Sequence, residues 1–265
     1  MSASNATMPV TATALGAGGP AAGSSGRRWL RRFVPLIAVA VVLAVLAIWA
    51  SSRDLDSIEA RTLNWDYIIT KTGEHLILTL VASALVAALA IPIGIAVSRS
   101  RSRLFRGAVG VVANIGQATP AVGLIILLAI AWQTGFVTAL VALVAYSFLP
   151  VLRNTVAGLD QIPASVRESA RGMGMTVGQS LRRIELPLAS PVIIAGLRTA
   201  LVFAVGVATV ATFINAGGLG DMIVNGLKLQ RYPVIVVGAV LVAAIAVLID
   251  WLAGLVEDLV RPKGL

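Results

Sequence analysis

Long apolar stretches alternate with shorter polar segments along this chain. Each stretch is close to the ~17 to 25 residues that a helix needs to cross a bilayer. The stretches are residues 33–50, 75–98, 108–131, 135–152, 191–214 and 233–256. We therefore predict an all-α polytopic membrane protein with about six transmembrane helices.

Charges in the connecting segments predict an orientation. Residues 51–74 carry five acidic and three basic side chains, and the link at residues 132–135 carries no charge. Because Lys and Arg concentrate in cytoplasmic loops, we place these two segments outside, and both termini with the arginine-rich loops in the cytoplasm. The loop arginines are Arg99, Arg101, Arg103, Arg106, Arg153, Arg167, Arg171, Arg182 and Arg183.

The two ends of the chain are polar. Residues 1–26 are uncharged and rich in Ala, Gly, Ser and Thr, and arginines follow, so residues 1–32 are predicted to be a disordered, basic-ended cytoplasmic tail. Residues 33–50 are the first predicted span. Small residues at 47–50 leave a cleaved signal peptide as an alternative, although the apolar run exceeds the usual ~7 to 15 residues. Residues 257–265 form a second cytoplasmic tail in this interpretation.

Composition excludes several classes of function. The chain is 58% hydrophobic and 12% charged, which indicates a lipid environment. Its net charge of +9 is explained by the loop arginines, so no nucleic acid partner is expected. With no cysteine and the single histidine His75, disulfides, thiolate zinc sites and histidine clusters are excluded, and no metal or cofactor is predicted.

The third stretch contains Asn114, Gln117, Thr119 and Pro120 in close succession. A proline inside a helix bends or breaks it, and the freed backbone groups must then face protein or water rather than lipid. Two interpretations stay open for these residues. They form a kink packed against neighbouring helices, or they line a gate in a translocation path.

The connection at residues 153–190 is long for a membrane bundle, which favours a functional role. Residues 164–173 are predicted to be a short helix with Val166, Ala170 and Met173 on one face. Glycines then interrupt it, and a second short helix over residues 179–184 is expected to end before Pro187, because the residue preceding proline disfavours helical dihedrals. The prediction is a bent two-helix projection with a cationic rim.

Two sequence segments in this connection carry a family resemblance. Glu168-Ser169-Ala170-Arg171-Gly172-Met173-Gly174 is followed, after nine residues, by Ile184-Glu185-Leu186-Pro187. This pattern resembles the EAA loop of bacterial ABC importer permeases in every spacing, with Ser169 in place of an alanine. Motif matches depend on context, and here the loop lies on the predicted cytoplasmic side.

The resemblance implies that the loop forms a coupling helix that docks on a cytoplasmic ABC ATPase, present in two copies. Glu168 would be the charged contact, and Gly174 would allow the bend. Arg167 and Arg171 are either further contacts or positive-inside charges. The implied coupling residues are Glu168, Ser169, Ala170, Gly174, Ile184, Leu186 and Pro187.

Within that family the chain is most similar to permeases for glycine betaine, choline, carnitine and related osmoprotectants. Three segments carry this similarity, although the last also resembles methionine permeases. The family implies an external solute-binding protein that recognises the substrate, and a second permease, either an identical chain or a paralogue. The segments are Glu74-His75-Leu76, Leu149-Pro150-Val151-Leu152-Arg153-Asn154-Thr155 and Ala216-Gly217-Gly218-Leu219-Gly220-Asp221.

The glycine cluster at residues 217–220 lacks the βαβ context of a nucleotide-binding loop, so it is predicted to be a tight outer turn. Asn215, Gly217 and Gly218 are therefore candidates for an outer gate. None of the three lysines lies in a Walker pattern. The chain is accordingly predicted to be no enzyme, with ATP hydrolysis in a partner chain.

Ionisable residues inside the apolar stretches are costly and are candidates for function. Arg198 and Asp250 either pair across helices, which is favoured, or line the path. His75 is expected at a span boundary rather than in a proton relay. A secondary transporter or channel remains the competing class, although no internal repeat is visible.

Overall fold

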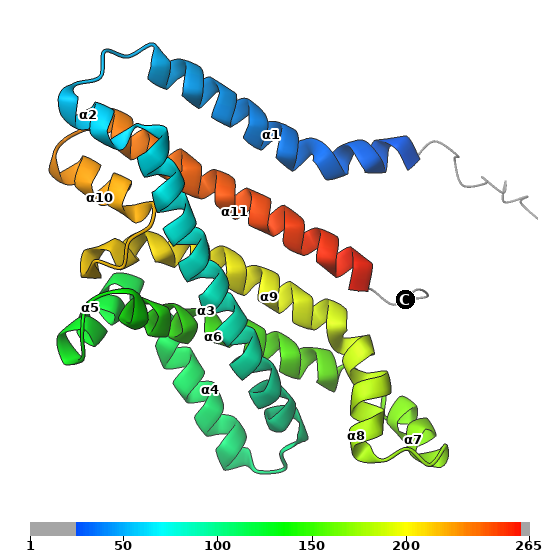
Figure 1. Cartoon of the computed structure of the whole chain (residues 1–265). Helices are drawn as coiled ribbons and strands as arrows, with labels where there is room; N and C mark the ends of the chain where they lie inside the picture. Colours follow the sequence, from blue (N-terminus) through cyan, green and yellow to red (C-terminus); the bar gives the residue numbers. More distant parts are fainter. Residues whose placement is uncertain (1–24, 261–265) are drawn as a thin grey trace, which may run out of the picture. The chain divides into compact units, whose positions relative to one another are not determined.

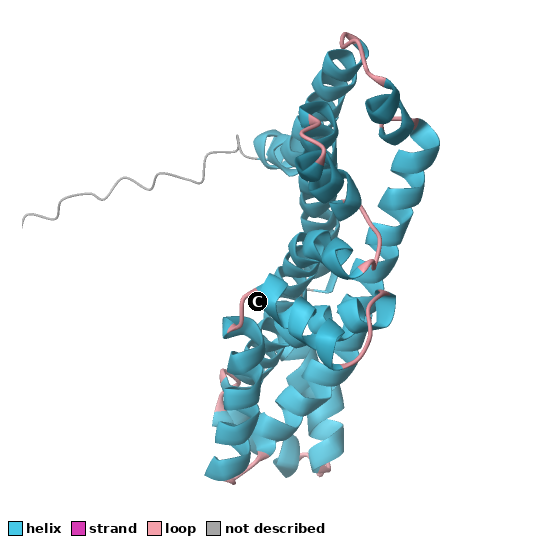
Figure 2. Cartoon of the chain, turned by 90° about the vertical axis from the view of Figure 1, so that its left-hand side faces the viewer, coloured by secondary structure: helices cyan, strands magenta, loops and turns pink. Residues whose placement is uncertain are grey.

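The computed structural model describes residues 25–260, with side chains from Phe33 onward. Residues 1–24 of the tail predicted over residues 1–32, and the last residues, 261–265, lie outside this part of the chain. Residues 25–32 are helical, so the prediction of disorder is wrong for them. Within it every regular element is a helix (Figure 2). The all-α prediction is therefore confirmed for the described residues.

The first helix, α1 (Ser25–Ser51), begins before the predicted start of the first span. Its segment after Pro35 belongs to the same compact unit as the rest of the chain. A short helix α2 (Ser57–Thr62) follows, with Asp56 as its N-cap. The backbone N–H of Glu59 donates to the Asp56 carboxylate, and this bond holds the pKa of that carboxyl below its usual range.

Three long helices form the centre of the unit (Figure 1), and two of them, α3 and α6, are longer than the apolar stretches that predicted them. They are α3 (Trp65–Arg99), α6 (Phe136–Asp160) and α9 (Leu186–Ala208). Small residues at the contacts let the backbones approach closely, as is common between membrane helices. A Cβ on Gly196 of α9 would lie 2.6 Å from the Asn154 Cβ, and one on Gly94 of α3 would lie 2.7 Å from the Thr155 Cβ. Alanine at either glycine would push the helices apart.

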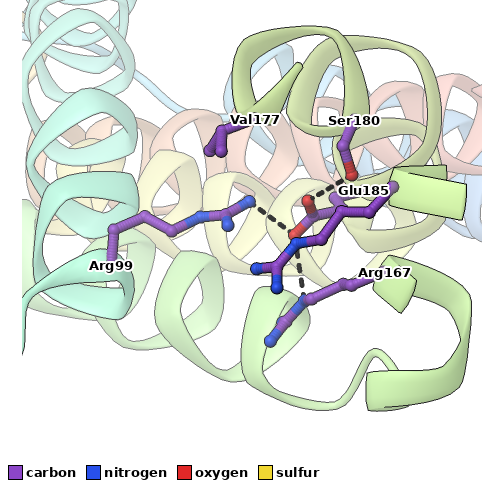
Figure 3. A pocket seen from close by; sticks show the side chains of 6 residues that line it. Arg99, Arg167, Val177, Ser180 and Glu185 are labelled. Carbon is purple, nitrogen blue, oxygen red and sulfur yellow. Dashed lines mark hydrogen bonds and ion pairs between the residues drawn. The ribbon is translucent and has the colours of Figure 1, made fainter. Parts of the chain in front are cut away.

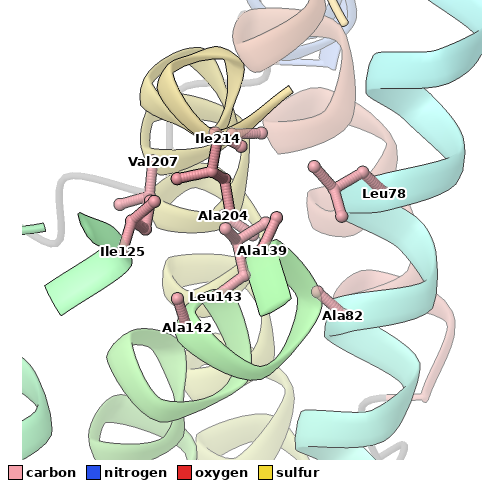
Figure 4. Packing of buried hydrophobic residues seen from close by; sticks show 11 residues of the cluster. Leu78, Ala82, Ile125, Ala139, Ala142, Leu143, Ala204, Val207 and Ile214 are labelled. Atoms are coloured by element: carbon pink, nitrogen blue, oxygen red, sulfur yellow. The ribbon is translucent and has the colours of Figure 1, made fainter. Parts of the chain in front are cut away.

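Buried apolar side chains fill the space where α3, α5, α6 and α9 meet (Figure 4). Leu78 and Leu143 are almost fully buried there, and Ile125 reaches the cluster from α5. A second cluster joins α9 and α10 (Gly220–Lys228) to α11 (Tyr232–Val260) around Leu219 and Met222. Each central helix therefore buries side chains on its inner face and leaves apolar side chains exposed outward, where lipid would contact them.

The third predicted span is broken. It consists of α4 (Arg103–Ala118) and α5 (Ala121–Ala131), which are bent by 101° at the break. Five helices of the described chain are long and apolar enough to cross a membrane, and six if this bent pair counts as one span. The prediction of about six spans with a bend in the third is confirmed in this sense.

The fifth predicted span begins earlier than expected. Helix α8 (Val177–Ser180) runs through one π-helical turn (Leu181–Glu185) directly into α9, which then ends in a 3₁₀ segment (Thr209–Ile214). The prediction that a short helix ends before Pro187 is wrong, because Leu186 keeps helical dihedrals (φ −63°, ψ −44°). Pro187 lies in the first turn of α9, directly after the wider π turn. Its missing N–H is tolerated in this position.

Candidate functional site

The predicted projection exists and lies at the end of α9 away from α10 (Figure 1). We call it the elbow and define it as residues 164–185, which comprise α7 (Ala164–Gly172), a turn, α8 and the π turn. It is shorter than the predicted loop at residues 153–190, because α6 continues to Asp160. The elbow is therefore a compact connection between α6 and α9.

Two residues of α7 predicted to contact an ATPase are accessible. Glu168 and Ser169 are exposed, whereas Ala170 is fully buried and holds α7 against the rest of the elbow. Within the described residues Glu168 forms no ion pair. An unpaired exposed carboxylate is available to a basic partner.

Met173 was predicted to share the packed face of α7 with Val166 and Ala170. Only Ala170 is fully buried, Val166 is half-buried, and Met173 is 66% exposed. The physical reason is that α7 ends at Gly172, so the helical spacing no longer applies to Met173. Val177 at the start of α8 is likewise 63% exposed, so the elbow has exposed apolar side chains.

Gly174 forms the bend after α7. Its φ is +78°, a left-handed conformation that glycine adopts without steric cost, and its N–H donates to the Arg171 carbonyl at 2.9 Å. A Cβ at this position would meet no atom within 4 Å. Backbone conformation alone therefore accounts for glycine at this bend.

The second half of the motif packs against the transmembrane body. Leu186 is half-buried against a cluster that includes Leu159, Ile162, Ala189 and Ile193. Ile184 is half-buried and Pro187 is exposed. Leu186 thus packs the start of α9 against the body, while the exposed surface of the elbow is formed by α7, α8 and Arg182 and Arg183 of the π turn.

Glu185, which has the most side-chain partners in the elbow, was not among the predicted coupling residues. Its carboxylate is 1% exposed and lies between Arg99 of α3, Arg167 of α7 and Ser180 of α8 (Figure 3). The sequence did contain a signal for this role. Glu185 lies between the apolar residues Ile184 and Leu186, and a buried charge needs a partner. Arg167 was predicted to be a partner contact or a positive-inside charge, but it pairs with Glu185 inside the elbow.

The break between α4 and α5 exposes polar groups. Thr119 caps α4 by donating from its hydroxyl to the Ile115 carbonyl at 2.7 Å, and Pro120 begins α5. Asn114 accepts a hydrogen bond from Arg153 at 2.7 Å, and both line a groove of about 250 Å³ between α4 and α6. Gln117 is half-buried in the same turn.

At the other end of the bundle, α3 contacts the glycine turn after the 3₁₀ segment. Asn215, Gly217 and Gly218 all have positive φ, of 60°, 81° and 91°. The Gly218 N–H donates to the Glu74 carboxylate at 2.8 Å. Lys71 pairs with Glu74 at 2.9 Å and with Asp221 at 2.7 Å, so charges close this turn against α3.

His75 was predicted at a span boundary. Its side chain is fully buried inside the protein, in the first third of α3, which begins at Trp65. Nε2 lies 3.1 Å from the Val205 carbonyl of α9, and Nδ1 is buried without a partner next to Gly218. His75 therefore lies beneath the glycine turn and joins α3 to α9.

Arg198 and Asp250 pair between α9 and α11, and Arg198 also reaches Glu257 at 3.5 Å. The favoured prediction of a pair across helices is confirmed. The candidate residues thus separate into the elbow at one end of α9, the glycine turn at the other, and the groove between α4 and α6. The structure brings Gly218 to Glu74 and Asn114 to Arg153, and it keeps the elbow apart from the glycine turn.

Comparison with known proteins agrees with this arrangement. The chain is 41% identical to the glycine betaine/carnitine/choline transport system permease protein OpuCB of Bacillus subtilis, over 76% of this chain and 92% of the relative. It is 35% identical to the osmoprotectant import permease protein OsmW of Salmonella typhimurium, over 80% of this chain and 100% of the relative.

A solved structure of the MetNI methionine ABC transporter in an inward-facing conformation has the same fold. Its TM-score is 0.65 at 23% identity, and the match covers 74% of this chain and 96% of that chain. The family model described as "Binding-protein-dependent transport system inner membrane component" matches residues 90–262. This range includes the elbow, the broken third span and the glycine turn, and the chain belongs to this family of multi-pass membrane transport subunits.

Proposed function

We propose that this chain forms the translocation path of an ATP-driven importer for a small osmoprotectant such as glycine betaine, choline or carnitine. The names of its relatives support this substrate class. These relatives are 35% to 41% identical to this chain over about three quarters of its length or more. The observation that carries the coupling role is the exposed carboxylate of Glu168 on the short helix α7, outside the transmembrane body.

We assign three kinds of partner protein to this chain. Its sequence contains no Walker motif, so ATP hydrolysis is assigned to two copies of a separate cytoplasmic ATPase. Substrate recognition is assigned to an external solute-binding protein. A second permease, identical or paralogous, completes the path. The permease domain is assigned to residues 64–256, and residues 33–50 are assigned to an additional span.

The proposed orientation places the elbow and both termini in the cytoplasm. Four arginines lie where α3 ends and α4 begins, and further arginines lie on the elbow, which supports this side. They are Arg99, Arg101, Arg103 and Arg106. At the other end Asp56, in a segment proposed to lie outside, pairs with Arg231 at 2.7 Å.

The proposed path passes the break in the third span and the glycine turn. The backbone groups freed at Thr119 and Pro120 require a polar neighbour or water, and Asn114, earlier in α4, lines the groove between α4 and α6. Asn215, Gly217 and Gly218 would form the outer end of this path, and Gln117 would face it from the α4 side.

The test is uptake in proteoliposomes. The permease is reconstituted with its ATPase and solute-binding protein, and uptake of labelled glycine betaine, choline and carnitine is measured with ATP, without ATP and without the ATPase. Uptake that requires both ATP and the ATPase is expected. Uptake without the ATPase would identify a secondary transporter, and uptake of methionine alone would assign a different substrate class.

A further inference from the structure

Glu185 connects four separate elements through one buried carboxylate. Its Oε2 accepts from Arg99 Nη2 at 2.5 Å and from Arg167 Nε at 3.1 Å, and its Oε1 accepts from Ser180 Oγ at 2.9 Å. Arg99 is the last residue of α3, Arg167 lies in α7, and Ser180 ends α8. Figure 3 shows these side chains converging on the carboxylate. Glu185 itself is followed directly by α9.

The position of this carboxylate affects how movement of the elbow reaches the transmembrane helices. The π turn that carries Glu185 is continuous with α9, so a displacement of α8 reaches α9 through the backbone. Helix α3 has no such covalent link to the elbow. Its end is tied to the elbow through Arg99 and Glu185, which are 86 residues apart in the sequence.

Arg167 extends the same connection to α6. Its Nη2 donates to the Leu159 carbonyl at 2.5 Å, while its Nε donates to Glu185. The arginine that projects from α7 is thus held to α6 and to Glu185 together. A guanidinium presents several donors in a fixed plane, which suits it to hold two acceptors in a set geometry.

A buried ion pair contributes little net stability compared with apolar packing, but it orients the groups that it joins. The apolar cluster beneath Leu186 already attaches the elbow to the body. The ion pairs of Glu185 therefore orient the elbow relative to α3, and the apolar cluster attaches it to the body. π turns also occur frequently at functional positions in helices.

We infer that Glu185 is a positioning residue that makes α3 move with the elbow. This inference rests on the proposed function, since the elbow is assumed to receive force from an ATPase. Without the pair between Arg99 and Glu185, the elbow still binds the ATPase and α9 still moves. The end of α3 then follows the elbow less closely, and ATP is hydrolysed with less substrate transported.

The experiment measures substrate transported per ATP hydrolysed in the reconstituted complex. Arg99→Gln removes only the tie to α3, Glu185→Gln weakens all three contacts, and Ser180→Ala removes a contact within the elbow. Arg101→Gln is the matched control, because Arg101 is exposed in the same connection. Arg99→Gln and Glu185→Gln are expected to lower transport per ATP roughly 3- to 30-fold, as for residues that carry coupling. Ser180→Ala and Arg101→Gln are expected to change it less than about twofold.

The conservative variant Arg99→Lys keeps the positive charge next to Glu185 and is expected to retain at least part of the coupling. Co-purification of the ATPase with each variant separates the two hypotheses. If the unaltered permease does not retain the ATPase, the proposed function fails. If it does, and Arg99→Gln transports as much substrate per ATP as the unaltered protein, Glu185 has no positioning role. Should Glu185→Gln not fold, Arg99→Gln alone decides the question.

Discussion

Arg198 of α9 and Asp250 of α11 form a two-point ion pair, with Nε to Oδ1 at 2.5 Å and Nη2 to Oδ2 at 2.6 Å. Both residues lie within helices long and apolar enough to span a membrane. Each charge is therefore tolerated because the other is present. The pair fixes α9 against α11 at the level of Asp250.

Replacing Arg198 with leucine is expected to leave Asp250 and Glu257 without their cation. The free energy of unfolding in detergent should fall by about 3 kcal/mol, the order of the cost of an unpaired charge in a membrane helix. Thermal unfolding measures this loss. An Arg198→Leu variant as stable as the unaltered protein would contradict a structural pair.

Glu168→Lys is expected to weaken binding of the ATPase by tenfold or more, since a charge reversal at an exposed contact replaces attraction with repulsion, at a cost of about 1.4 kcal/mol per tenfold. Membrane insertion should be unchanged because Glu168 is exposed. Pull-down of the ATPase measures the effect, with Glu168→Gln as an intermediate. Thr134→Lys adds a similar charge at the other end of α6 and should have no effect. Equal pull-down of Glu168→Lys and the unaltered permease would remove Glu168 from the interface.

Gly174→Val is expected to uncouple ATP hydrolysis from uptake. A β-branched residue at φ +78° is strained by about 1 to 3 kcal/mol, so the turn that orients α7 relative to α8 would change. Gly174→Asn should be milder because asparagine tolerates this conformation. Gly172→Val serves as the control, since Gly172 also has open space around it but no positive φ. Uptake by Gly174→Val at the unaltered level would show that the bend is dispensable.

Gly218→Ala is expected to destabilise the protein by about 2 kcal/mol, because its φ of +91° disfavours any side chain. The added Cβ would also lie 3.1 Å from His75 Nδ1. Gly206→Ala, where a Cβ meets nothing within 4 Å, is the matched control. Thermal unfolding in detergent compares the two. Equal midpoints would mean that the glycine turn adapts freely above His75.

The orientation can be tested with single introduced thiols, because the chain contains no cysteine. Ser165→Cys on α7 is expected to react with a membrane-impermeant reagent only after the cells are opened. Thr134→Cys, in the link between α5 and α6, is expected to react in intact cells. Both residues are exposed, so accessibility within the protein does not separate them. Labelling of Ser165→Cys from outside would reverse the orientation and remove the elbow from any cytoplasmic ATPase.

The features that were predicted correctly are determined by residues close together in the sequence. Apolar length located the spans, and Pro120 located the break in the third. Glycine at position 174 located the bend of the elbow, because a positive φ is a local requirement. Element boundaries were less accurate. Polar residues extend α3 and α6 beyond their apolar stretches, since a helix does not end where it leaves the apolar region.

What the sequence determined by itself was the membrane class, the α-helical architecture and the presence of an elbow, all of which follow from hydrophobicity and backbone preferences within short stretches. What only the tertiary structure decided was which charges meet and which side chains are enclosed. Glu185 finds Arg99 across 86 residues, and His75 is enclosed by α9 and the glycine turn. Such contacts require the packing of distant helices, and the pattern along one helix does not specify the partner that the next helix presents.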